Sequence, residues 1–392
     1  MAPNPRTAAS NPPPNMETLI SLTKSTQDLL SHFQGSLTAS SIAAKAPRNA
    51  TDTATSDAHN PLATIKATTT LLRSHTTTLS LLLLTPPLTP SAVMTKIGDV
   101  SSGTLAAMVA AATTESGPND VLGEVMRAEL RAQVRRLLST WGDLLGLVQR
   151  FAERRKTLGS TKDTGSSESE KQEVLATTGV VWEGCDALLK VCEDGVVGLI
   201  VRKAEEWRSV LLDAVEELKE WGDDVEDDGN EDKAEGSGDE DDGFDSDDEI
   251  FGAANKLGKD DKELKQLLDK SVKRLKMVGM LYQALIKRRL KTFPKQRATG
   301  AASNGETNSD HSPDTPTHRL DILLSQLKTI PETVDDLASA FYDLDEAEAN
   351  RTLSLCCQEA KSAINTAKQS WTGQDDEFTA WSAKWLEALE AS

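Results

Sequence analysis

An acidic run near the middle of the chain limits what this sequence can fold into. Residues 223–249 contain sixteen Asp or Glu side chains and one Lys. Like charges at this density repel one another, and the run has too few apolar side chains to form a core. We therefore expect a disordered acidic tether at 223–256, between a helical bundle at 16–222 and a C-terminal helical region at 257–392.

The composition outside this run favours helices. Hydrophobic residues make up 38% of the chain and aromatic residues only 4%, so the core must be built mainly from Leu, Val and Ala. We predict an all-α fold, a long-helix bundle with the up-and-down packing of vinculin- and catenin-like proteins. Residues 1–15 and a loop at 298–317 are polar or Pro-rich and are expected to be disordered.

The best-defined predicted helix begins at Pro61 and ends at a double proline. One apolar residue recurs every seven positions along it, at Ile65, Leu72 and Leu79. This spacing gives the helix one face for packing against other helices. Pro86 lacks an amide hydrogen and excludes helical geometry from the residue before it, so the helix should end near Thr85.

Apolar residues at spacings of three and four predict further helices along the chain. These are expected at about 16–37, 90–112, 120–156, 170–221, 264–285, 319–328, 334–342, 353–367 and 378–389. Gly195 and Gly198 predict a kink in the helix at 170–221, and Pro331 is expected to begin a new helix. The C-terminal aromatic cluster is expected to dock onto a core, and whether the C-terminal helices complete the first bundle or form a second one stays open.

Two short motifs carry a family resemblance. The first motif consists of Thr70, Leu71, Leu72, Arg73, Thr77, Leu79, Pro86 and Pro87. The second consists of Val334, Asp335, Asp336, Leu337 and Tyr342, beyond the acidic run. In order and spacing they resemble the signature stretches of the cyclin-D-interacting (GCIP-type) family. The resemblance implies a helical, non-enzymatic protein that binds cyclin D and other regulators of the cell cycle, in nucleus and cytoplasm.

The helix predicted at 264–285 is unusually basic, and its charges have three interpretations. They can pair with the acidic tether or an acidic surface, or contact nucleic acid or lipid. The third interpretation is a nuclear-import signal formed by Lys287, Arg288, Arg289 and Lys291. In the tether, Ser237 and Ser246 precede acidic residues and are candidate phosphorylation sites.

Charge and motif content exclude several function classes. A net charge of −19 argues against nucleic acid or anionic membrane as the main partner. The five histidines are scattered, no nucleophile or phosphate-binding motif is present, and the four cysteines are expected to be reduced and buried, so we predict no enzyme, metal or cofactor. Besides a cyclin-binding regulator, a cytoskeletal or adhesion adaptor and an acidic histone-chaperone-like protein remain as alternatives; the oligomeric state stays undetermined.

Overall fold

The computed structural model describes residues 15–43, 60–114, 122–158, 167–223, 257–258, 261–294 and 315–392. These residues are helical or lie in short connections, with no strand among them, which confirms the all-α prediction. They divide into two compact units, unit 1 (Met1–Gly195) and unit 2 (Val196–Ser392). Within the described ranges no helix has the length and apolar character needed to cross a membrane.

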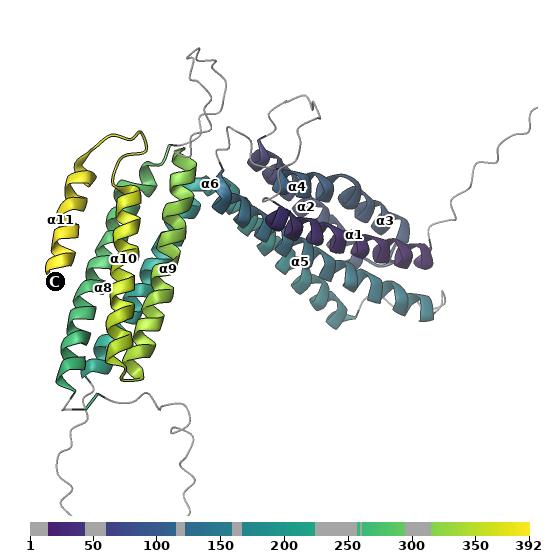
Figure 1. Ribbon diagram of the computed structural model, residues 1–392. Helices are drawn as coiled ribbons and strands as arrows, with labels where there is room; N and C mark the ends of the chain where they lie inside the picture. The colour runs from purple at the N-terminus through teal and green to yellow at the C-terminus, as the bar shows by residue number, and fades with distance from the viewer. Residues whose placement is uncertain are drawn as a thin grey trace, which may run out of the picture. The chain divides into compact units, whose positions relative to one another are not determined.

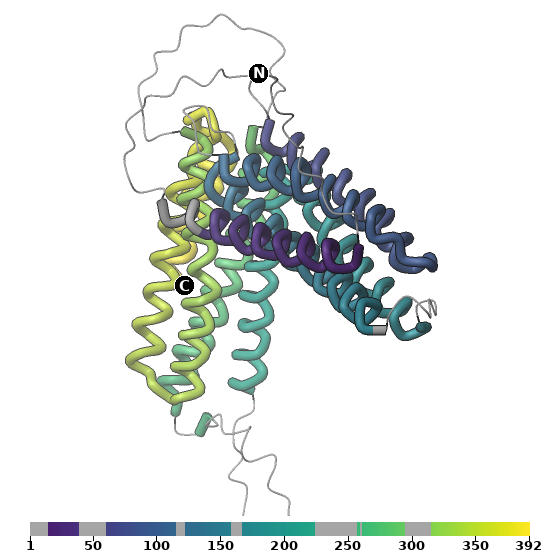
Figure 2. Tube along the Cα trace, turned by 90° about the vertical axis from the view of Figure 1, so that its right-hand side faces the viewer, coloured from purple at the N-terminus to yellow at the C-terminus, as the bar shows by residue number. Residues whose placement is uncertain are grey.

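Unit 1 is a bundle of long helices that lie side by side along a common direction (Figure 2). It contains α1 (Met16–Ala43), α2 (Pro61–Leu84), α3 (Pro90–Asp99), η1 (Val100–Thr104), α4 (Leu105–Thr113), α5 (Gly123–Leu158) and the first part of α6 (Glu168–Asp223). α1 packs along α5, and α2 packs on α3 and α4. Ion pairs Arg150–Glu173 and Arg154–Glu170 join α5 to α6 as antiparallel neighbours.

α2 begins and ends as the sequence predicts. The Asn60 side chain accepts a hydrogen bond from the Leu62 amide at 3.1 Å, and Pro61 occupies the first helical turn, where its missing N–H costs nothing. The helix ends at Leu84, and Thr85 is extended with φ −97° and ψ 112°. Its buried face includes the three residues of the seven-residue repeat, Ile65, Leu72 and Leu79.

The helix predicted at 90–112 is present as one helical path, α3–η1–α4, with a π-helical turn in its middle. The Ser101 hydroxyl donates to the Ile97 carbonyl at 2.6 Å, and the Ser102 hydroxyl donates to the Gly98 carbonyl at 2.8 Å. The Leu105 amide donates to the Val100 carbonyl, five residues earlier, which is the hydrogen bond of a π-helical turn.

The predicted kink in α6 lies at Gly195, where the backbone has φ 62° and ψ −165°. This conformation is open almost only to glycine, because other residues would place a Cβ against the backbone. The two units meet in the chain at this residue. The bundle predicted as a single body at 16–222 therefore ends at Gly195, and residues 196–222 pack with the C-terminal helices instead.

Unit 2 is a second helical bundle, which answers the question the sequence left open. It contains the rest of α6, α8 (Lys262–Arg288), η2 (Leu290–Thr292), α9 (Pro316–Tyr342), α10 (Glu346–Ala367) and α11 (Glu377–Ala391). Figure 1 shows α8, α9 and α10 side by side with α11 outermost. The start of α9 shortens the loop predicted at 298–317, and the rest of that loop, most of the acidic tether and residues 1–14 lie outside the described residues.

α9 is continuous, so the prediction of a new helix at Pro331 is wrong. Proline cannot donate to the carbonyl four residues earlier, here that of Leu327. The Tyr282 hydroxyl from α8 donates to this carbonyl instead. A tertiary hydrogen bond thus replaces the missing helical one and lets the helix pass through the proline.

The C-terminal aromatic cluster docks onto the bundle, as predicted. Phe378 and Trp385 of α11 are buried, and the Trp385 indole N–H donates to the Met277 carbonyl of α8 at 3.0 Å. α11 thereby covers α8 and α10 on the outer side of unit 2.

Candidate functional site

α2 exposes a face without charge to solvent. Along this helix the charged residues are Lys66 and Arg73, both toward one edge. The exposed positions between and beyond them are Ala67, Thr70, Leu71, Ser74, Thr78 and Leu81. Leu71 is 47% exposed and Leu81 is 59% exposed. We call these six residues the α2 face. A solvent-facing helix side normally carries charged residues, so this composition is typical of a contact surface.

The threonine hydroxyls of α2 are already bonded within the helix. Thr70 donates to the Lys66 carbonyl at 2.9 Å, and Thr78 donates to the Ser74 carbonyl at 3.1 Å. Thr77, beside the α2 face, donates to the Arg73 carbonyl at 2.9 Å. These donors are satisfied, so the α2 face is less polar than its sequence indicates.

The charged edge of α2 is paired with α6. The Arg73 guanidinium donates to the Asp186 carboxylate and lies 5.9 Å from the centre of the Trp182 ring. Lys66 donates to Glu193 at 3.0 Å. The first motif thus has two roles in the structure, since Leu72 and Leu79 are buried and Arg73 fixes α6 beside α2. The sequence contains no short-range signal for Trp182 or Asp186, because more than a hundred residues separate them from Arg73.

The apolar surface continues from α2 onto α6. The two ion pairs define an antiparallel register, in which residues further along α2 face earlier residues of α6. Leu175 precedes Asp186 by eleven residues, about three helical turns, and so lies on the same side of α6. It is exposed, and the register places it level with Leu84 near the end of α2. Pro86 and Pro87, which follow that end, are exposed as well.

The second motif has a packing role in unit 2. Val334 and Leu337 are buried, while Asp335 and Asp336 are exposed. The Tyr342 hydroxyl donates to the Glu217 carboxylate at 2.9 Å, and its ring lies 5.6 Å from that of Trp221. Partial burial, followed by the nearby charges of Asp336 and Glu217, raises the pKa of Asp335. The two motifs belong to different units.

The basic run proposed as an import signal is not continuous on the surface. Lys287, Arg288 and Lys291 are exposed, but Arg289 is buried. Its guanidinium donates to both Asp376 oxygens at 2.7 Å, which fixes it in a structural role. Nuclear import stays a prediction for the other three residues. Ser237 and Ser246, the candidate phosphorylation sites, lie outside the described residues.

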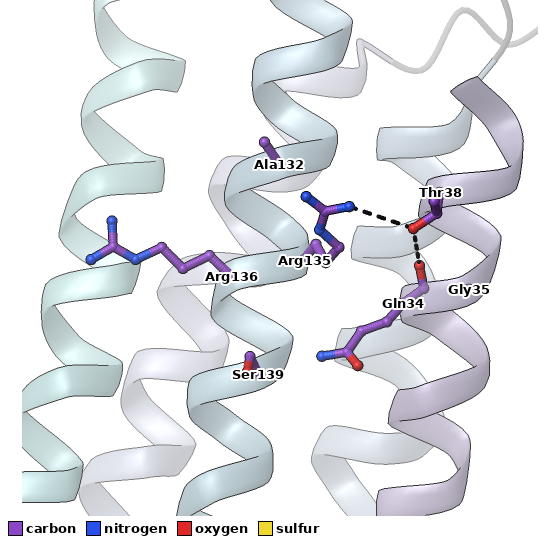
Figure 3. Close-up of a pocket in the computed structure, with 7 residues that line it drawn as sticks. All are labelled: Gln34, Gly35, Thr38, Ala132, Arg135, Arg136 and Ser139. Atoms are coloured by element: carbon purple, nitrogen blue, oxygen red, sulfur yellow. Dashed lines mark hydrogen bonds between the residues drawn. The ribbon is translucent and has the colours of Figure 1, made fainter. Parts of the chain in front are cut away.

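A shallow groove between α1 and α5 is a further candidate surface. Its volume is about 550 Å³, and its lining includes Arg135 and Arg136. Figure 3 shows that the two guanidinium groups diverge, with Arg135 directed toward Thr38 of α1 and Arg136 away from it. Arg136 lies 3.9 Å from Glu183. Because the two cations do not converge, the groove lacks the geometry of a two-arginine anion site.

The described side chains offer little for chemistry. Burial raises the pKa of the Cys185 thiol to about 12 and that of Cys192 to about 11, so both stay protonated near neutral pH. All four cysteines are free thiols. No cluster of His, Cys, Asp and Glu with the makings of a metal site occurs in the described part of the chain.

Comparison with known proteins relates the chain to a protein family and to a curated relative. Residues 64–224 match the model of the family described as "Grap2 and cyclin-D-interacting, N-terminal". This range contains the first motif, the α2 face and the α6 residues that pair with Lys66 and Arg73. The GCIP-type resemblance is therefore confirmed. An uncharacterized protein of Schizosaccharomyces pombe is 26% identical over 332 residues, which cover 84% of each chain.

Proposed function

We propose that this GCIP-type chain is a non-enzymatic module that binds a D-type cyclin. Its residues 64–224 match the N-terminal region of the Grap2 and cyclin-D-interacting family. The α2 face is the surface we assign to that partner. The α2 face lies within residues 64–224, which match the family model. Its assignment as a contact surface rests on the exposed, uncharged side chains that compose it. The family description supplies the class of partner.

The observation that carries the proposal is the exposure of Leu71 and Leu81 on a helix side without charge. When a partner covers leucine side chains that contact water, the free energy of binding becomes more favourable by about 25 cal/mol per Å² of apolar surface buried. The neighbouring hydroxyls of Thr70 and Thr78 are bonded to α2 itself, so covering them leaves no unsatisfied donor.

The structure of α2 also favours binding without rearrangement. The helix is capped by Asn60, is terminated at the double proline and is held to α6 by Arg73 and Lys66. A surface that is already rigid loses little conformational entropy when a partner binds. Binding by such a face needs no nucleophile, metal or cofactor.

Glutamate substitutions on the α2 face test the proposal. Leu71→Glu and Leu81→Glu place a charge where the partner would exclude water, and each should weaken binding of a D-type cyclin by about tenfold or more. The affinity of purified full-length protein for the cyclin is measured by isothermal titration calorimetry. Both positions are exposed in α2, so helix content and melting temperature should remain close to those of the parent chain.

Leu355→Glu provides the matched control. Leu355 is 40% exposed on α10 of unit 2, outside residues 64–224, and this variant should bind as the parent chain does. The proposal is wrong if the parent chain shows no affinity for a D-type cyclin. The assignment to the α2 face is wrong if both α2 variants bind with unchanged affinity, or if the control loses as much.

A further inference from the structure

α8 presents a row of lysines to solvent. Five exposed lysines recur along one side of this helix: Lys262, Lys265, Lys273, Lys276 and Lys287. At 100° per residue they lie within about 80° of the helix circumference. The opposite side is buried in the bundle through residues such as Leu268, Leu275 and Tyr282. We call the five residues the lysine stripe.

The lysine stripe forms no ion pair among the described residues, although Asp269 is exposed within the same arc of α8. Exposed lysines elsewhere form ion pairs, such as Lys66 with Glu193 and Lys156 with Glu17. Glu216 is paired with Lys219 at 3.0 Å and not with the lysine stripe. The hydrogen bond from Lys219 is the main cause of its lowered pKa, and the charge of Lys276 contributes a small part. In a chain of net charge −19, five exposed lysines without an ion pair form a surface that a polyanionic segment can occupy.

Residues 224–256 contain most of the acidic run, and the described residues on either side of them lie near the first turns of α8. At one end, Gly222 of α6 lies against Leu268 so closely that an added Cβ would come within 2.2 Å of the leucine Cδ2. At the other end, Leu257 is fully buried and the Gly258 amide donates to Asp261 at 3.1 Å, directly before α8. Residues 224–256 thus join two points that are fixed in unit 2.

Residues 224–256 are long enough to extend along the whole lysine stripe. Thirty-three residues at about 3.3 Å each reach roughly 110 Å, whereas α8, with 27 residues, is about 40 Å long. The segment can therefore follow the stripe and return. Attachment at both ends raises its local concentration at α8 to the millimolar range, so that individually weak ion pairs can add up to occupancy.

We infer that the acidic segment 223–249 binds the lysine stripe of α8 in the same chain. Sixteen carboxylates against one Lys supply the complementary charge. The same carboxylates repel nucleic acid and anionic lipid, so the segment is favoured over those ligands at this surface. The contact is electrostatic and exposed, and salt therefore weakens it.

Lysine footprinting of the full-length chain tests the inference. One variant replaces every Asp and Glu of 224–249 by Asn or Gln, and acetylation by an N-hydroxysuccinimide ester is followed at each lysine by mass spectrometry. The neutral variant should acetylate the lysine stripe at least threefold faster than the parent chain. Raising salt to about 0.5 M should produce the same increase in the parent chain, because the Debye length then falls to a few ångströms.

Two further measurements identify the occupant. Lys368 and Lys384, exposed elsewhere in unit 2, serve as internal controls and should react equally in both chains. A carbodiimide, which couples a lysine to a carboxylate only when they touch, should join the lysine stripe to residues 223–249 at a yield independent of protein concentration. Equal stripe reactivity in both chains overturns the inference, and so do cross-links that vanish on dilution, which would mean a second copy of the chain.

Discussion

At the scale of single residues, Arg289 is the clearest case of a side chain whose role is set by distant partners. It donates to both oxygens of Asp376 at 2.7 Å, to the Ala367 carbonyl at 2.8 Å and to the Lys368 carbonyl at 3.0 Å. Its guanidinium lies 4.3 Å from the centre of the Phe378 ring. This arrangement fastens the end of α8 to the end of α10 and the start of α11.

Asp376→Asn should destabilise unit 2 because it leaves the buried Arg289 cation without its carboxylate. Asn can still cap α11 through its one oxygen, so the change removes the charge and one of the two acceptors for Arg289. Asp376 is 38% exposed, and we expect a loss of only about 1–2 kcal/mol in the free energy of unfolding at pH 7. Chemical denaturation measures it, and Asp375→Asn, a neighbour outside this cluster, should change the free energy by less than about 0.5 kcal/mol.

The same pair gives the pH dependence of this effect. Hydrogen bonds from Arg289 lower the pKa of Asp376 to about 2 from its ordinary value of 3.8. The stabilisation is complete above pH 4 and is lost as the pH falls toward 2. The difference between the parent chain and Asp376→Asn should therefore shrink over that interval, and a constant difference would contradict this account.

The sequence shows Arg289 only as one of several cations in a basic run. Which member of the run is buried depends on Asp376, Ala367 and Lys368, and these residues lie 78–87 positions further along the chain. Local periodicity predicts the helix that ends just before Arg289 but contains no signal for those partners.

At the scale of helices, α9 shows how a tertiary contact overrides a local rule. A proline within a helix costs about 3 kcal/mol because it removes a hydrogen bond and crowds the preceding turn. At Pro331 the freed carbonyl of Leu327 is satisfied by the Tyr282 hydroxyl. The sequence predicts a break at Pro331 because the donor lies 45 residues away on α8.

A double-mutant cycle should reveal this compensation. Tyr282→Phe leaves the Leu327 carbonyl without a donor and should lower the free energy of unfolding by about 1–3 kcal/mol. In a Pro331→Ala background the backbone amide gained at that position can bond to the same carbonyl, so the tyrosine change should cost about 1 kcal/mol less. Chemical denaturation of the four proteins gives the coupling energy. A coupling near zero would mean that Tyr282 does not compensate for the proline.

At the scale of the whole chain, periodicity and composition were sufficient to predict the helices but not their grouping. The predicted helical segments of both regions are present, although those at 319–328 and 334–342 form the single helix α9. Their apolar spacing is strong, and some ends are marked by residues such as Asn60 and Pro86. The boundary at Gly195 was expected only as a kink, because one glycine in a helical pattern does not indicate which bundle the following residues join.

The candidate site was predictable only in part, for the same reason. The first motif locates α2 within the matched residues 64–224. Which of its side chains face solvent follows from packing against α3, α4 and α6, so the exposure of Leu71 and Leu81 required the structure. The α2 face, rather than the motif as a whole, is therefore the central claim about function.

Hydrogen exchange of the full-length chain with and without a D-type cyclin tests this claim most directly. Covering the α2 face should slow amide exchange along α2, above all at the peptides that contain Leu71 and Leu81, and should leave α9, α10 and α11 unchanged. Protection confined to the helices of unit 2, or unchanged exchange along α2 under saturating cyclin, would contradict it.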